Sequence, residues 1–404
     1  MTFDNLRIVM DDAPTFAQLE GYSHPYGPLD VAFLESTSVK MARHIVGTFL
    51  SRYGATLGAR GSSDLAGVLE SWLSQPTLHE TIWDDAFGQA RACLTGPLGD
   101  RLVLEAAAGL GSRLCATGVS ARFGVTLERA SRLTFASWLL PTAAKLRFES
   151  DGNEVSIEAS GGGNDSSLRF RRVGSRWAMS SGNASPIVEV ERRGGPVQLL
   201  QRDALFPLAM GDLEPMIPEV VTADVSASVE EAFAILRDHA PRYADWVSRP
   251  ARRIVPLASP PGLMMSSSSI YRPGTITMSH NAYPLGMAEI LVHENTHEYM
   301  HLASSCGPVD DGSDTKLYFS PIRGVDRPIS AILVAYHAVG NIVLFYRECR
   351  RTNAPGAAYL DVSEPEAMAW LAELDGPLSR TGSLTAVGRA LYEPLRVQLR
   401  DQLR

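Results

Sequence analysis

The sequence has few cysteines, and no pairing pattern connects them. The four cysteines, Cys93, Cys115, Cys306 and Cys349, are scattered over 404 residues and none belongs to a CxxC pair. This spacing excludes the usual thiolate zinc site and a dense disulfide framework. We expect free or buried thiols in a reducing compartment.

Long apolar runs and an excess of basic residues are also missing. No stretch reaches the roughly eighteen consecutive apolar residues of a membrane span. Asp4, Asp11 and Asp12 lie where the apolar core of a signal peptide would be. The formal net charge of −8 argues against a general nucleic-acid binder. We therefore expect a cytoplasmic protein that binds neither a membrane nor nucleic acid. The sequence does not indicate the oligomeric state.

The chain does contain clear helical periodicity before a change of pattern. Apolar residues recur at three-to-four spacing over about 31–140, and this predicts helices, the later ones near 77–94, 99–117 and 126–140. Between about 143 and 205, apolar and polar residues alternate, which predicts a small antiparallel sheet.

The expected fold class is therefore α+β and mostly helical. We assign 1–142 to a helical N-terminal region, 143–220 to a small antiparallel β region and 221–404 to a metal-binding catalytic domain. Within the last part the patterns predict, in order, a helix at 229–242, a strand at 252–257, a mobile loop at 260–269, a strand at 274–279, and helices from 285, over 328–350 and from 363.

The residues best suited to bind a metal lie on the predicted helix that begins near Leu285. His293 and His297 are four residues apart, slightly more than one turn, so both imidazoles project from the same face. Two imidazoles at this spacing can bind one metal ion, with Glu294 beside them. The alternative is a pair of histidines that hydrogen-bond to backbone carbonyls.

A third metal ligand must come from elsewhere in the chain. His337 is the preferred candidate, because it is a polar residue in an otherwise apolar stretch of the helix over 328–350. Asp326, Glu348 and His301 stay open as alternatives, although His301 lies about 12 Å along the helix from His293.

The residues that follow the pair disfavour one subclass of zinc protease. In HExxHxxGxxH enzymes a glycine ends the helix and a third histidine follows, but here Met300 and Ala303 occupy those positions.

Residues 285–350 resemble the HExxH-motif peptide-modification family. The resemblance depends on ILVHENTHEYMH at 290–301, on the Ser-Pro-Ile-Arg and Asp-Arg-Pro segments of 317–328, and on the apolar helix after them. Two positions depart from the family pattern: Ile322 stands where a tryptophan is frequent, and Val334 stands where a histidine often falls.

The resemblance implies an Fe(II)- and 2-oxoglutarate-dependent dioxygenase. Such an enzyme hydroxylates the β-carbon of a residue in a ribosomally made precursor peptide. Arg323 or Arg327 would then bind the distal carboxylate of 2-oxoglutarate, because a guanidinium offers paired donors. The alternative for each arginine is an ion pair with Asp310, Asp311 or Asp314.

Two other functions remain open from the sequence. A zinc metallopeptidase would use the same histidines, with Glu294 as the general base that activates a zinc-bound water. A non-catalytic peptide-binding protein would keep the histidine helix as a structural element. In any of the three, the strand at 274–279 offers an edge to which a peptide strand could add.

Overall fold

A computed structural model describes residues 14–75, 82–96, 100, 102–202, 211–260, 262–281 and 283–403. The protein is 51% helical and 20% strand, which confirms the mostly helical α+β fold. The described helices are α1 (Phe16–Ser23), α2 (Val31–Ala59), α3 (Ser63–Leu73), α4 (Asp85–Thr95), α5 (Val103–Thr117), η2 (Gly211–Met216), α6 (Ala223–His239), α7 (Pro241–Ser248), α8 (Pro284–Cys306), α9 (Ile329–Arg351), α10 (Ala357–Leu378) and α11 (Ala386–Leu403). The four cysteines are free.

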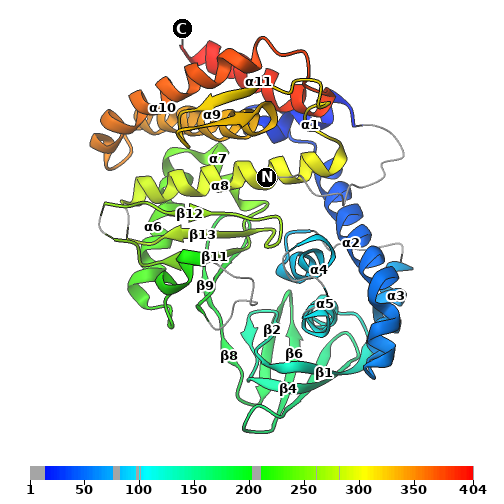
Figure 1. Ribbon diagram of the computed structural model, residues 1–404. Helices are drawn as coiled ribbons and strands as arrows, with labels where there is room; N and C mark the ends of the chain where they lie inside the picture. The colour runs from blue at the N-terminus through cyan, green and yellow to red at the C-terminus, as the bar shows by residue number, and fades with distance from the viewer. Residues whose placement is uncertain are drawn as a thin grey trace.

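An antiparallel sheet forms the lower part of the molecule in Figure 1. Helices α3 and α5 pack against strand β1. Opposite residues Phe123 and Phe148 stack with ring centroids 4.8 Å apart, so the two strands share an aromatic core. In spatial order its strands are β1 (Ala121–Ser131), β4 (Ala143–Ser150), β5 (Glu154–Ser160), β6 (Ser166–Val173) and β7 (Arg176–Ser181).

The helix predicted over 126–140 is wrong. This stretch forms the second half of β1 followed by the short strands β2 (Thr134–Phe135) and β3 (Trp138–Leu139), which pair with each other and with β8 (Ser185–Pro186). Val125 and Leu127 are buried while Thr126 and Glu128 between and after them are exposed. This period of two belongs to a half-buried strand and outweighs the helical spacing. The antiparallel region therefore begins at Ala121 and not at 143.

A second, mixed sheet lies under the helix that carries the histidines. Its three inner strands are parallel, and the two outer strands run antiparallel to their neighbours. Every residue of β11 and β13 is buried, as expected for strands covered on both faces. The order is β12 (Ser266–Ser267), β13 (Thr275–Ser279), β11 (Arg253–Leu257), β10 (Val197–Leu199) and β9 (Val188–Val190).

The predicted strands at 252–257 and 274–279 are confirmed, but the second is not an edge. Strand β13 lies between β12 and β11, so it cannot accept a peptide strand; the edge position belongs to β12. Residues 266–267 of the predicted loop form this edge strand.

Helix α8 packs between this sheet and the C-terminal helices (Figure 1). It begins with Pro284 in its first turn, where the missing N–H costs no hydrogen bond. Tyr299 of α8 stacks on Trp246 of α7, with centroids 4.3 Å apart. Helices α9 and α6 flank α8, which is therefore held on several sides.

Helix α9 is apolar enough to resemble a membrane span by length and composition. Its most apolar eighteen-residue window has a mean hydropathy of 1.7, but 78% of that window is buried inside the protein. Burial of this kind is typical of the core helix of a soluble protein.

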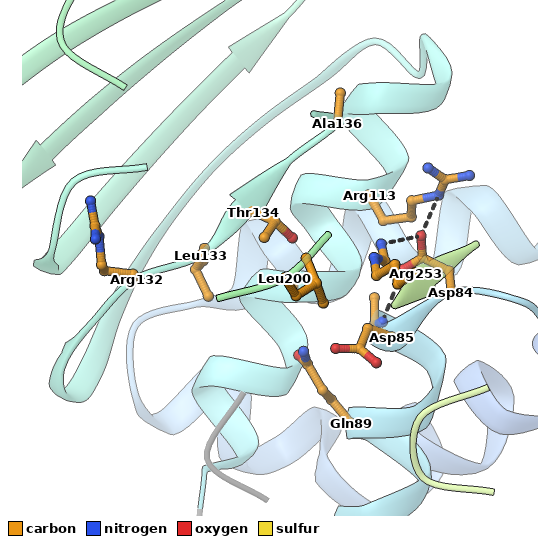
Figure 2. A pocket seen from close by; sticks show the side chains of 12 residues that line it. Asp84, Asp85, Gln89, Arg113, Arg132, Leu133, Thr134, Ala136, Leu200 and Arg253 are labelled. Carbon is orange, nitrogen blue, oxygen red and sulfur yellow. Dashed lines mark hydrogen bonds and ion pairs between the residues drawn. The ribbon is translucent and has the colours of Figure 1, made fainter. Parts of the chain in front are cut away.

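A buried charge cluster joins the N-terminal helices to the mixed sheet. Figure 2 shows Arg113 and Arg253 converging on Asp84, at distances of 3.3 and 3.0 Å from its Oδ2. The other oxygen accepts from the backbone N–H of Ala86 and caps α4. Burial alone would raise the pKa of Asp84, but Arg253 and Arg113 outweigh it and the pKa is lowered. The carboxylate is therefore charged and stabilises the junction of α4, α5 and β11.

We predict that Asp84→Asn lowers the free energy of unfolding by about 3 kcal/mol at neutral pH, because two arginines lose their buried counter-charge. A lowered pKa contributes stability above the unfolded pKa, about 3.9, which is lost as the pH falls. The loss of unfolding free energy in the variant, measured by urea denaturation, should therefore become smaller as the pH falls.

The control is Glu149→Gln, which removes the exposed ion pair between Glu149 and Arg122 and is expected to cost about 1 kcal/mol or less. Equal effects of both variants would contradict this role of Asp84.

Candidate metal centre

The two predicted histidines face one another on α8. The Nε2 atoms of His293 and His297 are 3.1 Å apart, and their ring planes meet at 83°. No backbone carbonyl is bonded to either ring within the described residues. The spacing of four residues thus brings two ring nitrogens to one point, as the sequence predicts.

This arrangement fits two ligands of one metal ion. Nitrogens each about 2.1 Å from a common ion, at an angle near 90°, lie about 3 Å apart. Desolvation and the neighbouring His293 ring lower the pKa of His297 to about 4. Its ring is therefore neutral at physiological pH and has a lone pair for a metal.

Glu294 is buried on the side of α8 that faces the sheet edge. Its Oε1 accepts from the Ser266 hydroxyl at 2.5 Å, and its Oε2 accepts from the Ser268 hydroxyl at 2.6 Å. Oε1 is 4.0 Å from Nε2 of His293. Burial would raise the pKa of Glu294, but the two histidines and the two hydroxyls outweigh it and the pKa is lowered. Glu294 is thus an ionised carboxylate with a hydroxyl bound to each oxygen.

The pair opens into a cavity of about 120 Å³ between α8, α9 and a hairpin. The hairpin consists of β14 (Leu317–Ser320) and β15 (Val325–Pro328), which are antiparallel. The lining residues are His293, His297, Ser320, Ile322, Arg323, Arg327, Ser330, Ala331, Val334, Ala335 and Ala338.

Both predicted arginines lie in this cavity. Arg327 comes from β15 and Arg323 from the turn before it. Neither side chain forms an ion pair with any residue that the structure describes. Asp314, one of the alternative partners, instead accepts from Tyr318 and Thr381. Two arginines without a carboxylate therefore share the cavity with the two histidines.

His337 is not among the residues that line the cavity. Its Nε2 donates to the backbone carbonyls of Tyr22 and Ser23, at 3.0 and 2.9 Å, so it holds α1 against α9. Burial lowers its pKa to about 4, and the backbone of Thr296 on α8 is also among the groups that act on the ring. Because His337 does not line the cavity, its role as the third metal ligand stays a prediction.

The alternative third ligands do not line the cavity either. Asp326 is exposed on β15, Glu348 accepts from Tyr26 at 2.7 Å, and His301 lies about two turns beyond His293. Among the described residues, no three histidine, cysteine, aspartate or glutamate side chains are grouped to hold a metal ion. The centre therefore offers two protein ligands.

Sequence reasoning missed the polar groups that surround the pair. Ser266 and Ser268 belong to a serine run that the sequence assigns to a loop; their spacing of two, which puts both on one side of an extended segment, was the available signal. Glu289, one turn before His293, accepts from the hydroxyls of Tyr346 and Tyr359. Glu289 is half-buried on the histidine face of α8, and desolvation raises its pKa.

No protein-family model and no curated protein sequence matches this chain.

Proposed function

We propose that this protein is an Fe(II)- and 2-oxoglutarate-dependent dioxygenase that hydroxylates the β-carbon of a residue in a ribosomally made precursor peptide. The observation that carries the proposal is the cavity itself, in which the imidazoles of His293 and His297 share one space with two arginines that lack ion-pair partners among the described residues. A peptidase needs the histidines but has no cosubstrate carboxylate for an arginine to bind. We place the enzyme in the cytoplasm, in keeping with its free thiols.

Each group in the cavity has a role in this proposal. His293 and His297 would hold the iron, which together with 2-oxoglutarate and dioxygen supplies the oxidising power for hydroxylation. Arg327 or Arg323 would bind the distal carboxylate of 2-oxoglutarate through paired N–H donors. The apolar wall, which includes Val334, limits the access of water and so strengthens the charge interactions.

Glu294 would position the site and not act as a base. Both of its oxygens already accept hydrogen bonds from serine hydroxyls. These bonds tie α8 to the edge strand β12 and to the segment after it. The arrangement supports a fixed, ionised carboxylate that orients the site.

The alternative is a zinc metallopeptidase with Glu294 as the general base. The observation in its favour is that Glu294 Oε1 lies 4.0 Å from His293 Nε2, near where a metal-bound water would sit. A non-catalytic peptide-binding protein would keep the same fold without turnover.

We predict that Glu294→Gln keeps its iron and part of its hydroxylase activity, because glutamine retains the size and an acceptor for a serine hydroxyl. A peptidase would lose nearly all turnover with its base. Metal content and mass-spectrometric analysis of the peptide product measure both properties. His297→Ala is the control that should lose the metal. Intact iron without any peptide oxidation would contradict a purely positioning role.

We predict that Arg327→Ala weakens 2-oxoglutarate binding by about 2–5 kcal/mol, because a desolvated carboxylate loses its charged partner. Arg323→Ala is tested beside it, and we expect the larger effect at Arg327, which is on a paired strand next to α9. Lysine should rescue only partly, since it lacks the planar fork.

The measurement is a titration of 2-oxoglutarate into Fe(II)-loaded protein, followed by the metal-to-ligand absorption band. Arg351→Ala, an exposed arginine at the end of α9, is the matched control and should leave binding unchanged. Parent-like binding in both the Arg327 and Arg323 variants would remove the main support for the oxygenase.

A further inference from the structure

The wall of the cavity that α9 contributes carries no histidine, cysteine or carboxylate side chain. Ser330, at the start of α9, adds one hydroxyl; the other lining residues of this helix are Ala331, Val334, Ala335 and Ala338, which lie on one face at three-to-four spacing. Their side chains are short hydrocarbons. A donor atom at any of these positions would enter the space shared by the imidazoles, but the sequence puts none there.

The one histidine of this helix is committed elsewhere. Nε2 of His337 donates to two carbonyls of α1, and Asn341, one turn later, donates to the carbonyl of Ser23. The two side chains therefore form a joint between α1 and α9. Turning His337 into the cavity would leave the carbonyl of Tyr22 without this buried donor, which is unfavourable.

The charges around the cavity are unbalanced. Its lining contains Arg323 and Arg327 and no aspartate or glutamate. The histidines add no negative charge, because a metal ligand is a neutral imidazole. A divalent ion bound there would add two more positive charges, with Glu294 as the nearest carboxylate. Such a space attracts anions.

We propose that the metal centre has only two protein ligands, His293 and His297, and that a small monovalent anion from solution occupies the coordination position beside Val334. The anion is a halide or a small carboxylate. This inference rests on the metal site of the proposed function. It accounts for the lack of a histidine or carboxylate in the α9 wall and for the hydrogen bonds that His337 makes to α1.

The test measures metal affinity and not turnover. Co(II), an air-stable probe with visible absorption bands that report its ligands, is titrated into the whole protein in perchlorate, in chloride and in formate at equal ionic strength. We expect chloride or formate to tighten Co(II) binding several-fold over perchlorate and to shift the absorption bands. The two salts distinguish a halide from a carboxylate ligand.

Val334→His supplies the missing ligand within the protein. We expect it to tighten Co(II) binding in perchlorate by about tenfold or more, since even partners beyond the direct ligands contribute about 10–100-fold. The anion effect should then disappear. Val334→Leu, which changes size without adding a donor, is the matched control and should bind Co(II) like the parent.

Two further variants separate the possible failures. His337→Gln keeps a donor for the α1 carbonyls, and it should bind Co(II) like the parent; loss of binding would make His337 the third ligand and overturn the inference. His293→Ala should abolish binding in every salt. Parent binding that depends on His293 but ignores anions and Val334→His overturns this inference and leaves the proposed function standing. Absence of Co(II) binding in the parent overturns both.

Discussion

The site depends on the spacing of two histidines along one buried helix. Because His293 and His297 are one turn apart, their Nε2 atoms meet at 3.1 Å without any bend in the chain. The rest of the structure holds this helix in place. Ser266 of β12 and Ser268 after this strand bind Glu294, α7 stacks on Tyr299, and α9 closes the other side. The fold therefore holds the histidine pair in place.

Two pairs of arginines in this molecule have opposite surroundings: one pair contacts a carboxylate and the other does not. At the junction of α4 and β11, Asp84 neutralises two arginines, and this cluster holds parts of the fold together. In the cavity beside the histidines, Arg323 and Arg327 have no carboxylate partner among the described residues. Arg323 is exposed and Arg327 is half-buried, so both guanidinium groups are accessible to an anionic ligand. The contrast supports a binding role for the second pair of arginines.

Local patterns predicted the parts of the site that depend on local geometry. The helices at 284–306 and 329–351 and the strands β11 and β13 follow from periodicity, and the histidine pair follows from its spacing. Contacts between segments that are far apart in the chain produce no periodicity or spacing in the sequence, so they could not be predicted from it. In the sequence, His337 is a polar residue in an apolar helix whether it binds a metal or a backbone carbonyl. Its hydrogen bonds to the carbonyls of Tyr22 and Ser23 become visible only when α1 is placed against α9. The misassigned stretch at 126–140 carried both periodicities, and packing against α5 selected the strand.

The proposed function requires that the cavity binds iron and 2-oxoglutarate. The most direct test is to purify the whole protein without oxygen, measure its bound metal, and follow succinate release when 2-oxoglutarate, dioxygen and a candidate precursor peptide are added. We expect bound iron, and succinate formation that requires both 2-oxoglutarate and His293. Tightly bound zinc with peptide cleavage and no succinate would contradict it.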